Sequence, residues 1–345
     1  MAALILGLGD AIMNHRIYVG TIGEGLWRSV DGGETFKRAC DGMFVECHVR
    51  ALVVHPDDDR VLYLGCELGL FRSEDGADSW NRIDSPASGQ QVWSILFGTS
   101  PPHPRPLSPG GARGGNGPGT LLVGVCPSRL YLSNDAGKTW TEPAARILQA
   151  CPRILHTRVT TLLADPRNPQ TMWAGVEIDG LQRTRDGGRT WHPVGKGLSS
   201  QDIHALAILP SKLIATTNND VNVSTDEGDT WTPLRLGEKL PLPYFRGLAQ
   251  HAERPDILFL GNGDAPPGTT GLIARSLDGG VTWQPASMPA RANSTIWNFA
   301  VHPSDPNLIY ASSVSGQAYR SNDAGATWHK LAREFGEIRA LAWTP

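Results

Sequence analysis

The chain has 345 residues, with 31 Lys or Arg against 34 Asp or Glu and a formal net charge of −3. This balance argues against nucleic acid or an anionic membrane surface as the main partner. No run of eighteen apolar residues predicts a membrane span, and five cysteines without metal-finger spacing are expected to be reduced thiols.

The apolar start of the chain, residues 2–8, lacks a basic leader and a clear cleavage site, so a signal peptide is not expected. We therefore expect a cytoplasmic protein, with a secreted or periplasmic location left open. The sequence contains no P-loop, dinucleotide fingerprint or zinc motif. Neither a cofactor nor a metal ion is expected.

An eight-residue pattern, Ser/Thr-x-Asp-x-x-x-Thr-aromatic, recurs along the chain. It first spans residues 29–36 and last spans 321–328, and the five copies between them open at Ser73, Ser133, Thr184, Ser224 and Ser276. Copies 40 to 60 residues apart are typical of the four-stranded blades of a propeller. The sequence predicts an all-β fold, a seven-bladed β-propeller with one such turn in each blade.

The pattern has the chemistry of a tight turn between two strands. The Asp and Ser/Thr side chains can hydrogen-bond to the backbone of the turn, and a Gly at the fifth position allows a positive φ. The second copy departs, because Ala77 replaces this Gly and Ser79 replaces the Thr. We expect slight backbone strain in that turn.

These turns resemble Asp boxes, also called BNR repeats. Such repeats occur in sialidases, xyloglucan-cleaving glycosidases, sortilin-type receptors and a photosystem II assembly factor, and the resemblance covers nearly the whole chain. It is specific for the fold, but it implies no single function, because these relatives do unrelated things.

The copies organise the chain as one domain over residues 1–345. In blade 2 the expected strands are 50–56, 61–65 and 69–73, and a copy of the innermost strand reappears at 339–345 without a blade of its own. We infer that this C-terminal strand closes the ring on blade 1, although the apolar residues 2–8 could fill the same place. The Pro- and Gly-rich insertion at 99–119 is predicted to be disordered.

Loops of different length are expected on the two faces of the ring. His55 and His302 begin short turns on one face, where we interpret them as structural. The long connections gather on the other face, where sites are usually built, and they comprise 142–157, 233–244, 263–271 and 285–295.

Alignment of the innermost strands places one residue of each blade at the mouth of the central channel. These residues are Arg50, Trp93, Thr160, His204, Arg246, Trp297 and Arg339, flanked by His48, Gln91, Arg158, Asp202, Tyr244 and Asn298, with Glu67 and Glu177 at matching strand ends. In one interpretation the arginines bind the carboxylate, sulfate or phosphate of a small ligand such as a sugar acid, and Trp93 and Trp297 form flat walls. In the other, each arginine pairs with Glu67, Glu177 or Asp202 and ties neighbouring blades together.

Catalysis at this mouth would follow from the resemblance. Sialidases hold the carboxylate of their substrate with an arginine triad, pair a Tyr nucleophile with a Glu, and use an Asp as acid. Here Tyr244 with Glu177 or Glu67 would form the pair, and Asp264 or Asp202 would be the acid. However, sialidases have six blades, and xyloglucan-cleaving relatives place two Asp residues between two propellers. A lyase with His204 or Tyr244 as base is another possibility.

The non-enzymatic alternative is a scaffold. The photosystem II assembly factor resembles this chain in having an arginine patch on a seven-bladed ring, and it holds a partner protein. We therefore predict an axial pocket for an anionic or carbohydrate-like ligand, with hydrolase or lyase activity left open. A protein partner on the face with the long loops is the alternative.

Overall fold

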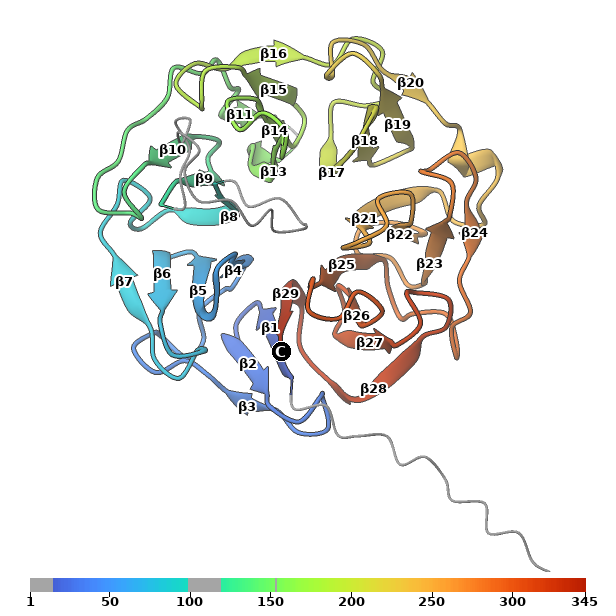
Figure 1. Cartoon of the computed structure of the whole chain (residues 1–345), viewed down its shortest axis with the longest axis horizontal. Helices are drawn as coiled ribbons and strands as arrows, with labels where there is room; N and C mark the ends of the chain where they lie inside the picture. Colours follow the sequence, from blue (N-terminus) through green and yellow to red (C-terminus); the bar gives the residue numbers. More distant parts are fainter. Residues whose placement is uncertain (1–14, 99–118, 153) are drawn as a thin grey trace, which may run out of the picture.

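The computed structural model describes residues 15–98, 119–152 and 154–345, and its strands form seven sheets around a central axis (Figure 1). The predicted all-β seven-bladed propeller is confirmed. The insertion predicted to be disordered, 99–119, lies outside the described residues except for Gly119. The apolar run 2–8 also lies outside them. No helix among the described residues is long and apolar enough to cross a membrane.

In each blade the strands run from the axis outward. Blade 1 orders β29 (Ile338–Thr344), β1 (Arg16–Thr21), β2 (Leu26–Ser29) and β3 (Lys37–Arg38). Blade 2 consists of β4 (Ala51–His55), β5 (Asp58–Cys66), β6 (Gly69–Ser73) and β7 (Asn81–Ile83). Blade 3 consists of β8 (Gln91–Phe97), β9 (Leu121–Cys126) and β10 (Leu130–Ser133), and a bridge from Leu132 to Thr141 stands in place of its outer strand.

The remaining blades have four strands each. Blade 4 consists of β13 (Val159–Ala164), β14 (Met172–Val176), β15 (Gly180–Thr184) and β16 (His192–Val194). Blade 5 consists of β17 (Ile203–Leu209), β18 (Lys212–Thr217), β19 (Val221–Ser224) and β20 (Thr232–Pro233). Blade 6 consists of β21 (Tyr244–Gln250), β22 (Leu258–Gly263), β23 (Gly271–Ser276) and β24 (Gln284–Pro285). Blade 7 consists of β25 (Ile296–Val301), β26 (Ile309–Ser313), β27 (Gln317–Ser321) and β28 (His329–Glu334).

The long connections contain little further structure. A small hairpin of β11 (Ala150–Cys151) and β12 (Leu155–His156) lies between blades 3 and 4, and a short 3₁₀ helix η1 (Leu236–Glu238) lies between blades 5 and 6. The C-terminal strand β29 pairs antiparallel with β1 along its whole length, so the end of the chain closes the ring, as the repeat pattern predicted.

The seven repeated turns share one hydrogen-bond pattern. In the first copy the Ser29 hydroxyl accepts from the N–H of Gly33 at 2.8 Å, and the Asp31 carboxylate accepts from the N–H and hydroxyl of Thr35 at 2.9 and 2.5 Å. The same three bonds recur in every other copy. Ala77 adopts a φ of 68°, which confirms the expected strain of the second copy, worth roughly 1–2 kcal/mol.

The hydrophobic core lies between neighbouring blades. Tyr18 and Leu26 of blade 1 pack in one cluster with Leu62, Leu64 and Phe71 of blade 2, and similar clusters join the later blades. Among the five free cysteines, Cys40, Cys47 and Cys66 are buried and the other two are half-buried. Packing between blades therefore holds the ring together.

Candidate functional site

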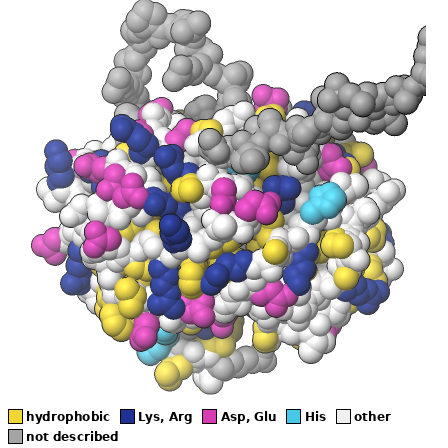
Figure 2. Space-filling model, turned by 90° about the horizontal axis from the view of Figure 1, so that it is seen from below, with side chains coloured by type: hydrophobic (Ala, Val, Ile, Leu, Met, Phe, Trp, Pro, Cys, Tyr) yellow, Lys and Arg dark blue, Asp and Glu magenta, His cyan; other side chains and the backbone are white. Residues whose placement is uncertain are grey.

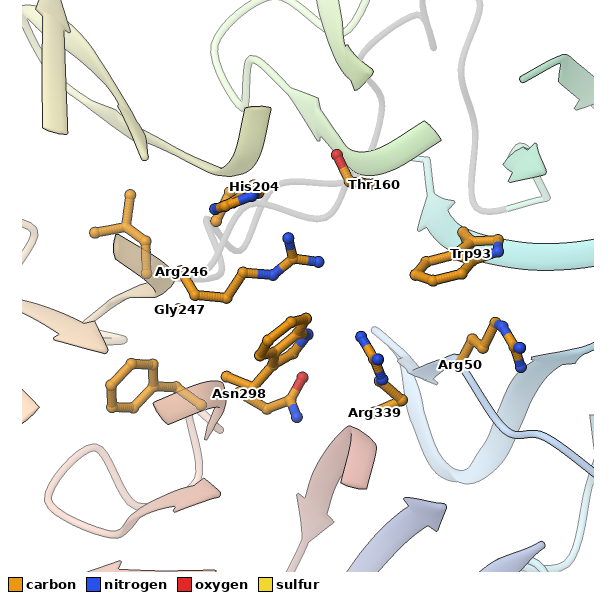
Figure 3. Close-up of a pocket in the computed structure, with 12 residues that line it drawn as sticks. Arg50, Trp93, Thr160, His204, Arg246, Gly247, Asn298 and Arg339 are labelled. Atoms are coloured by element: carbon orange, nitrogen blue, oxygen red, sulfur yellow. The ribbon is translucent and has the colours of Figure 1, made fainter. Parts of the chain in front are cut away.

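The mouth of the channel on the face with the long loops opens into a cavity of about 220 Å³. All seven positions aligned from the sequence line it, so the structure brings together Arg50, Trp93, Thr160, His204, Arg246, Trp297 and Arg339. Arg246 and Arg339 extend toward the middle of the cavity, and the Trp93 ring lies across from them (Figure 3). Asn298, predicted as a neighbour, also lines the cavity.

The lining residues are aimed inward by β-bulges. The pairing of the innermost strand with its neighbour shifts register at Trp93, Thr160, His204 and Trp297, and the shift in blade 6 spans both Arg246 and Gly247. In blade 1 the register shifts where β29 passes Arg339. An extra residue at a bulge has no partner in the ladder, and its side chain is turned out of the regular alternation. The same device in successive blades therefore presents consecutive residues, such as Arg246 and Gly247, to the channel.

The charge of the cavity is positive. Among the described residues that line it, three are arginines and none is acidic. Burial is the main cause that lowers the pKa of Arg50 and of Arg339, and for Arg339 the charge of Arg246 lowers it further. Elsewhere on the ring, positive and negative side chains are interspersed over the side seen in Figure 2. The cavity lining, in contrast, carries positive side chains and no negative one among the described residues.

Two tryptophans separate the arginines. The Arg246 guanidinium lies 4.1 Å from the centre of the Trp297 ring and that of Arg339 lies 4.5 Å from it. The Trp93 ring has the guanidinium of Arg158 at 4.5 Å and that of Arg50 at 5.1 Å. Contacts of this kind stabilise a cation without neutralising it. The tryptophans thus hold the arginines in place and leave their charge available to a ligand.

The carboxylates near the cavity are already engaged. Glu177 lies 2.5 Å from Nε of Arg158 as an ion pair that lacks hydrogen-bond geometry, and Glu67 accepts from the backbone N–H of His48 at 2.7 Å. Arg339 contacts Glu337. Within the part of the chain that the structure describes, neither Arg50 nor Arg246 forms an ion pair with a carboxylate. Arg158 and Glu177 lie at the ends of two adjacent strands of blade 4, so their ion pair joins strands of one blade and is not a tie between blades, and Arg50 and Arg246 lack a carboxylate partner of either kind among the described residues.

His204 belongs to a buried cluster in the wall of the cavity. Its Nδ1 lies 2.7 Å from the carbonyl oxygen of Phe245, which can only accept, so Nδ1 carries the proton. Its Nε2 lies 3.3 Å from the Asp202 carboxylate and 3.5 Å from the Tyr244 hydroxyl. Burial, reinforced by the charge of Arg246, lowers the pKa of His204, so the ring is neutral at pH 7. Neutral His204 can accept a proton at Nε2.

The pKa values of the two nearby carboxyls shift in opposite directions, although burial acts to raise both. Burial raises the pKa of Glu177, and the charge of Arg158 offsets only part of this effect. It would also raise the pKa of Asp202, but the neighbouring His204, Arg246 and Arg158 outweigh it, so the pKa of Asp202 is lowered. Burial raises the pKa of Tyr244 as well. Glu177 and Asp202 therefore differ in proton affinity, as the two carboxyls of an acid–base pair would.

Other predicted site residues lie outside the cavity lining. Tyr244, His48, Arg158, Glu67 and Glu177 surround it without lining it. Asp264 accepts hydrogen bonds from the N–H groups of Thr269 and Thr270 and stabilises its own loop. No group of three or more His, Cys, Asp or Glu side chains in the described residues could hold a metal ion.

Sequence reasoning missed two apolar residues of the cavity lining. Leu248 and Phe299 line the cavity two residues beyond Arg246 and Trp297 on the same strands. Because bulges interrupt the alternation at Arg246 and at Trp297, the strand period alone does not predict these two residues. The turn histidines were interpreted correctly, because Nδ1 of His55 and of His302 accepts a backbone N–H of its own turn.

Comparison with known proteins gives relatives at low identity. No family model matches the chain. The chain is 26% identical over 307 residues to xyloglucanase Xgh74A of Acetivibrio thermocellus, a match that covers 80% of this chain and 29% of that protein. It is 26% identical over 243 residues to a probable oligoxyloglucan-reducing end-specific xyloglucanase of Neosartorya fischeri, covering 68% of this chain and 26% of that protein. The chain thus spans less than a third of the length of these curated relatives.

Among solved structures, "YCF48 bound to D1 peptide" aligns with a TM-score of 0.59 at 17% identity. The alignment covers 91% of this chain and 89% of the other, so the likeness extends over the whole ring. At this level of identity it establishes the fold alone.

Proposed function

We propose that the axial cavity binds the anionic group of a small molecule, a carboxylate, sulfate or phosphate. The observation that supports this best is the convergence of Arg50, Arg246 and Arg339 on a cavity with no acidic lining residue among those described. Guanidinium groups match planar and tetrahedral oxyanions by paired hydrogen bonds. Arg339 contacts Glu337, but Arg50 and Arg246 form no ion pair among the described residues; such unpaired charge is costly in the empty protein, and a bound anion would remove that cost.

A thermal-shift screen tests this proposal. The wild type is titrated with acetate, benzoate, sulfate, phosphate and glucuronate at constant ionic strength, beside Arg246→Gln and the matched control Arg60→Gln. Arg60 is exposed on a turn at the opposite face, so its loss changes the net charge equally without touching the cavity. A ligand at a hundred times its Kd stabilises the folded state by about 2.7 kcal/mol.

We expect at least one class of anion to raise the melting temperature of the wild type and of Arg60→Gln, and to lose this effect in Arg246→Gln. The proposal is wrong if no class of anion stabilises the wild type. It is also wrong if Arg246→Gln responds as the wild type does.

A second candidate function is glycosidase-like hydrolysis. It is favoured by the 26% identity to xyloglucanases and by Glu177 and Asp202, whose pKa values burial and neighbouring charges push apart. Glycoside hydrolysis generally needs one carboxyl that stays protonated and one that is ionised. Glu177 would be the acid and Asp202 the base, which requires that Glu177 be protonated and its ion pair with Arg158 be broken.

Release of reducing ends from xyloglucan tests this second candidate. Activity that Glu177→Gln and Asp202→Asn abolish, and that the exposed control Glu253→Gln keeps, would support it. If the wild type releases no reducing ends, and neither small anions nor xyloglucan change its stability, a non-catalytic protein-binding scaffold remains. The whole-ring likeness to a peptide-bound propeller supports that alternative.

A further inference from the structure

A second cavity, of about 330 Å³, lies on the same axis at the other end of the innermost strands. It is lined by residues of β8, β13, β17, β21 and β25 and of the turns that follow them. Twelve of its fourteen lining residues are apolar, and the exceptions are Gln250 and His251. The two mouths of the channel therefore have opposite character, cationic at one and aliphatic at the other.

The polar side chains of the second cavity are occupied by their own turn. Nδ1 of His251 accepts hydrogen bonds from the N–H groups of Glu253 and Arg254, each at 3.1 Å. The Arg254 side chain lies 3.4 Å from Nε2, so both ring nitrogens of His251 are next to donors. Gln250 donates to the carbonyl of Pro255 at 3.0 Å. Burial, the largest cause, lowers the pKa of His251, so this wall carries no charge at pH 7. An occupant of the second cavity meets hydrocarbon almost everywhere.

The two cavities follow one another along shared strand faces. Leu248 lines the first cavity and Gln250 the second, and Phe299 and Val301 are divided in the same way. Both pairs lie beyond the bulges of β21 and β25, where residues two apart point to the same side. Since a strand rises about 3.3 Å per residue, the four steps from Arg246 to Gln250 span roughly 13 Å.

We propose that the ligand is a chain amphiphile, whose single anionic head group binds the arginines and whose hydrocarbon tail runs along the channel into the second cavity. This inference rests on the proposed anion site and names the class of molecule that the site takes. Charge complementarity selects the head group, because the first cavity presents three guanidinium groups. The apolar wall selects the tail, because a polar chain would lose its hydrogen bonds to water without replacement.

A chain-length series measures the tail. Isothermal titration calorimetry gives Kd for acetate, butyrate, hexanoate, octanoate and decanoate at fixed ionic strength and below their critical micelle concentrations. We expect Kd to fall roughly fourfold for each added methylene group, since each buried CH₂ contributes about 0.8 kcal/mol, until the tail fills the second cavity. Glucuronate, an anion without a tail, and 1-octanol, a tail without a charge, should bind far more weakly than octanoate.

Two variants separate the tail from the head group. Ala164→Phe fills part of the second cavity, and Val301→Glu places a charge in its wall; neither residue lines the first cavity. Either variant should abolish the dependence on chain length while leaving acetate binding unchanged. Arg246→Gln should weaken every member of the series by a similar factor.

Each remaining outcome overturns part of the reasoning. If acetate and decanoate bind equally well, the tail is excluded and the anion site stands. If 1-octanol binds as tightly as octanoate, the apolar cavity acts independently of the arginines and the single-ligand proposal is wrong. If no anion binds, both the amphiphile and the proposed function are wrong.

Discussion

Replacing Arg158 and Arg246 separately by Gln should change the stability of the ligand-free protein by clearly different amounts. Each change removes one positive charge and keeps a polar side chain. Arg158 is ion-paired with Glu177, and 25% and 15% of the two side chains are exposed. Loss of one partner costs about 3–5 kcal/mol for a fully buried pair and roughly 0–1 kcal/mol for an exposed one. For this largely buried pair we expect Arg158→Gln to lower the free energy of unfolding by about 2 kcal/mol.

Arg246 forms no ion pair with a carboxylate among the described residues. Its loss removes the contact with Trp297, which contributes about 0.5–2 kcal/mol. The loss also removes repulsion, because the positive charge of Arg246 lowers the pKa of both Arg339 and His204. Since these two effects oppose one another, Arg246→Gln should change the free energy of unfolding by less than about 1 kcal/mol.

Urea unfolding, followed by circular dichroism in a chloride buffer without oxyanions, measures both variants. High salt should reduce any gain from Arg246→Gln, because salt screens the repulsion that the substitution relieves. If Arg246→Gln is destabilised as much as Arg158→Gln, Arg246 has a structural role like that of Arg158 and the cavity loses its main support as an anion site.

Three further results are expected. The hydrogen bonds of the repeated turn lower the pKa of Asp226 from 3.8 to about 2. Its contribution to the stability of the fold is therefore complete above pH 4 and is lost as the pH falls toward 2. In Asp226→Asn the melting temperature should depend less on pH over this range. Gly325→Ala would bring a Cβ to 2.3 Å from the Phe259 ring at a φ of +78°, and it should lower the free energy of unfolding in urea by about 3 kcal/mol. Gly33→Ala would meet only flexible side-chain ends at 3.1 Å and should cost about 1 kcal/mol. Equal losses would contradict this packing argument. Burial lowers the pKa of His204 in the folded protein, so below about pH 6.5 the histidine is protonated in the unfolded chain before it is protonated in the folded one, and stability drops. His204→Gln should therefore lose less stability than the wild type between about pH 6.5 and 5.

The fold and the ring of mouth residues could be predicted because both follow from local, repeated signals. The turn that begins at Ser29 makes all its side-chain hydrogen bonds within eight residues, so each copy specifies its own geometry. The spacing of the copies then aligns the innermost strands, which is why Arg50 and Arg339 could be assigned to one axis despite their distance in sequence.

Pairing and partners could not be predicted in this way. A bulge such as the one at His204 depends on how β17 meets β18, and no residue type in the strand specifies it. The pairing of Arg158 with Glu177 depends on side-chain positions at the end of two adjacent strands. The apolar cavity was missed because residues such as Ile208 and Val301 have the same pattern as buried core.

The division of labour within the ring explains how the axis can carry an unfavourable set of charges. Stability comes from the interfaces between blades, where side chains such as Tyr18, Tyr63 and Trp173 are almost fully buried. At the mouth, apolar neighbours of the lining residues such as Val159, Ile203 and Ile296 supply the packing, so a cationic lining residue costs its own desolvation and repulsion without opening a hole in the core. A bulge at nearly every one of these positions also interrupts a ladder that regular pairing would otherwise complete. Irregular pairing and converging arginines at the same mouth both cost stability, and both lie where the ring tolerates such costs because its interfaces between blades supply the stability.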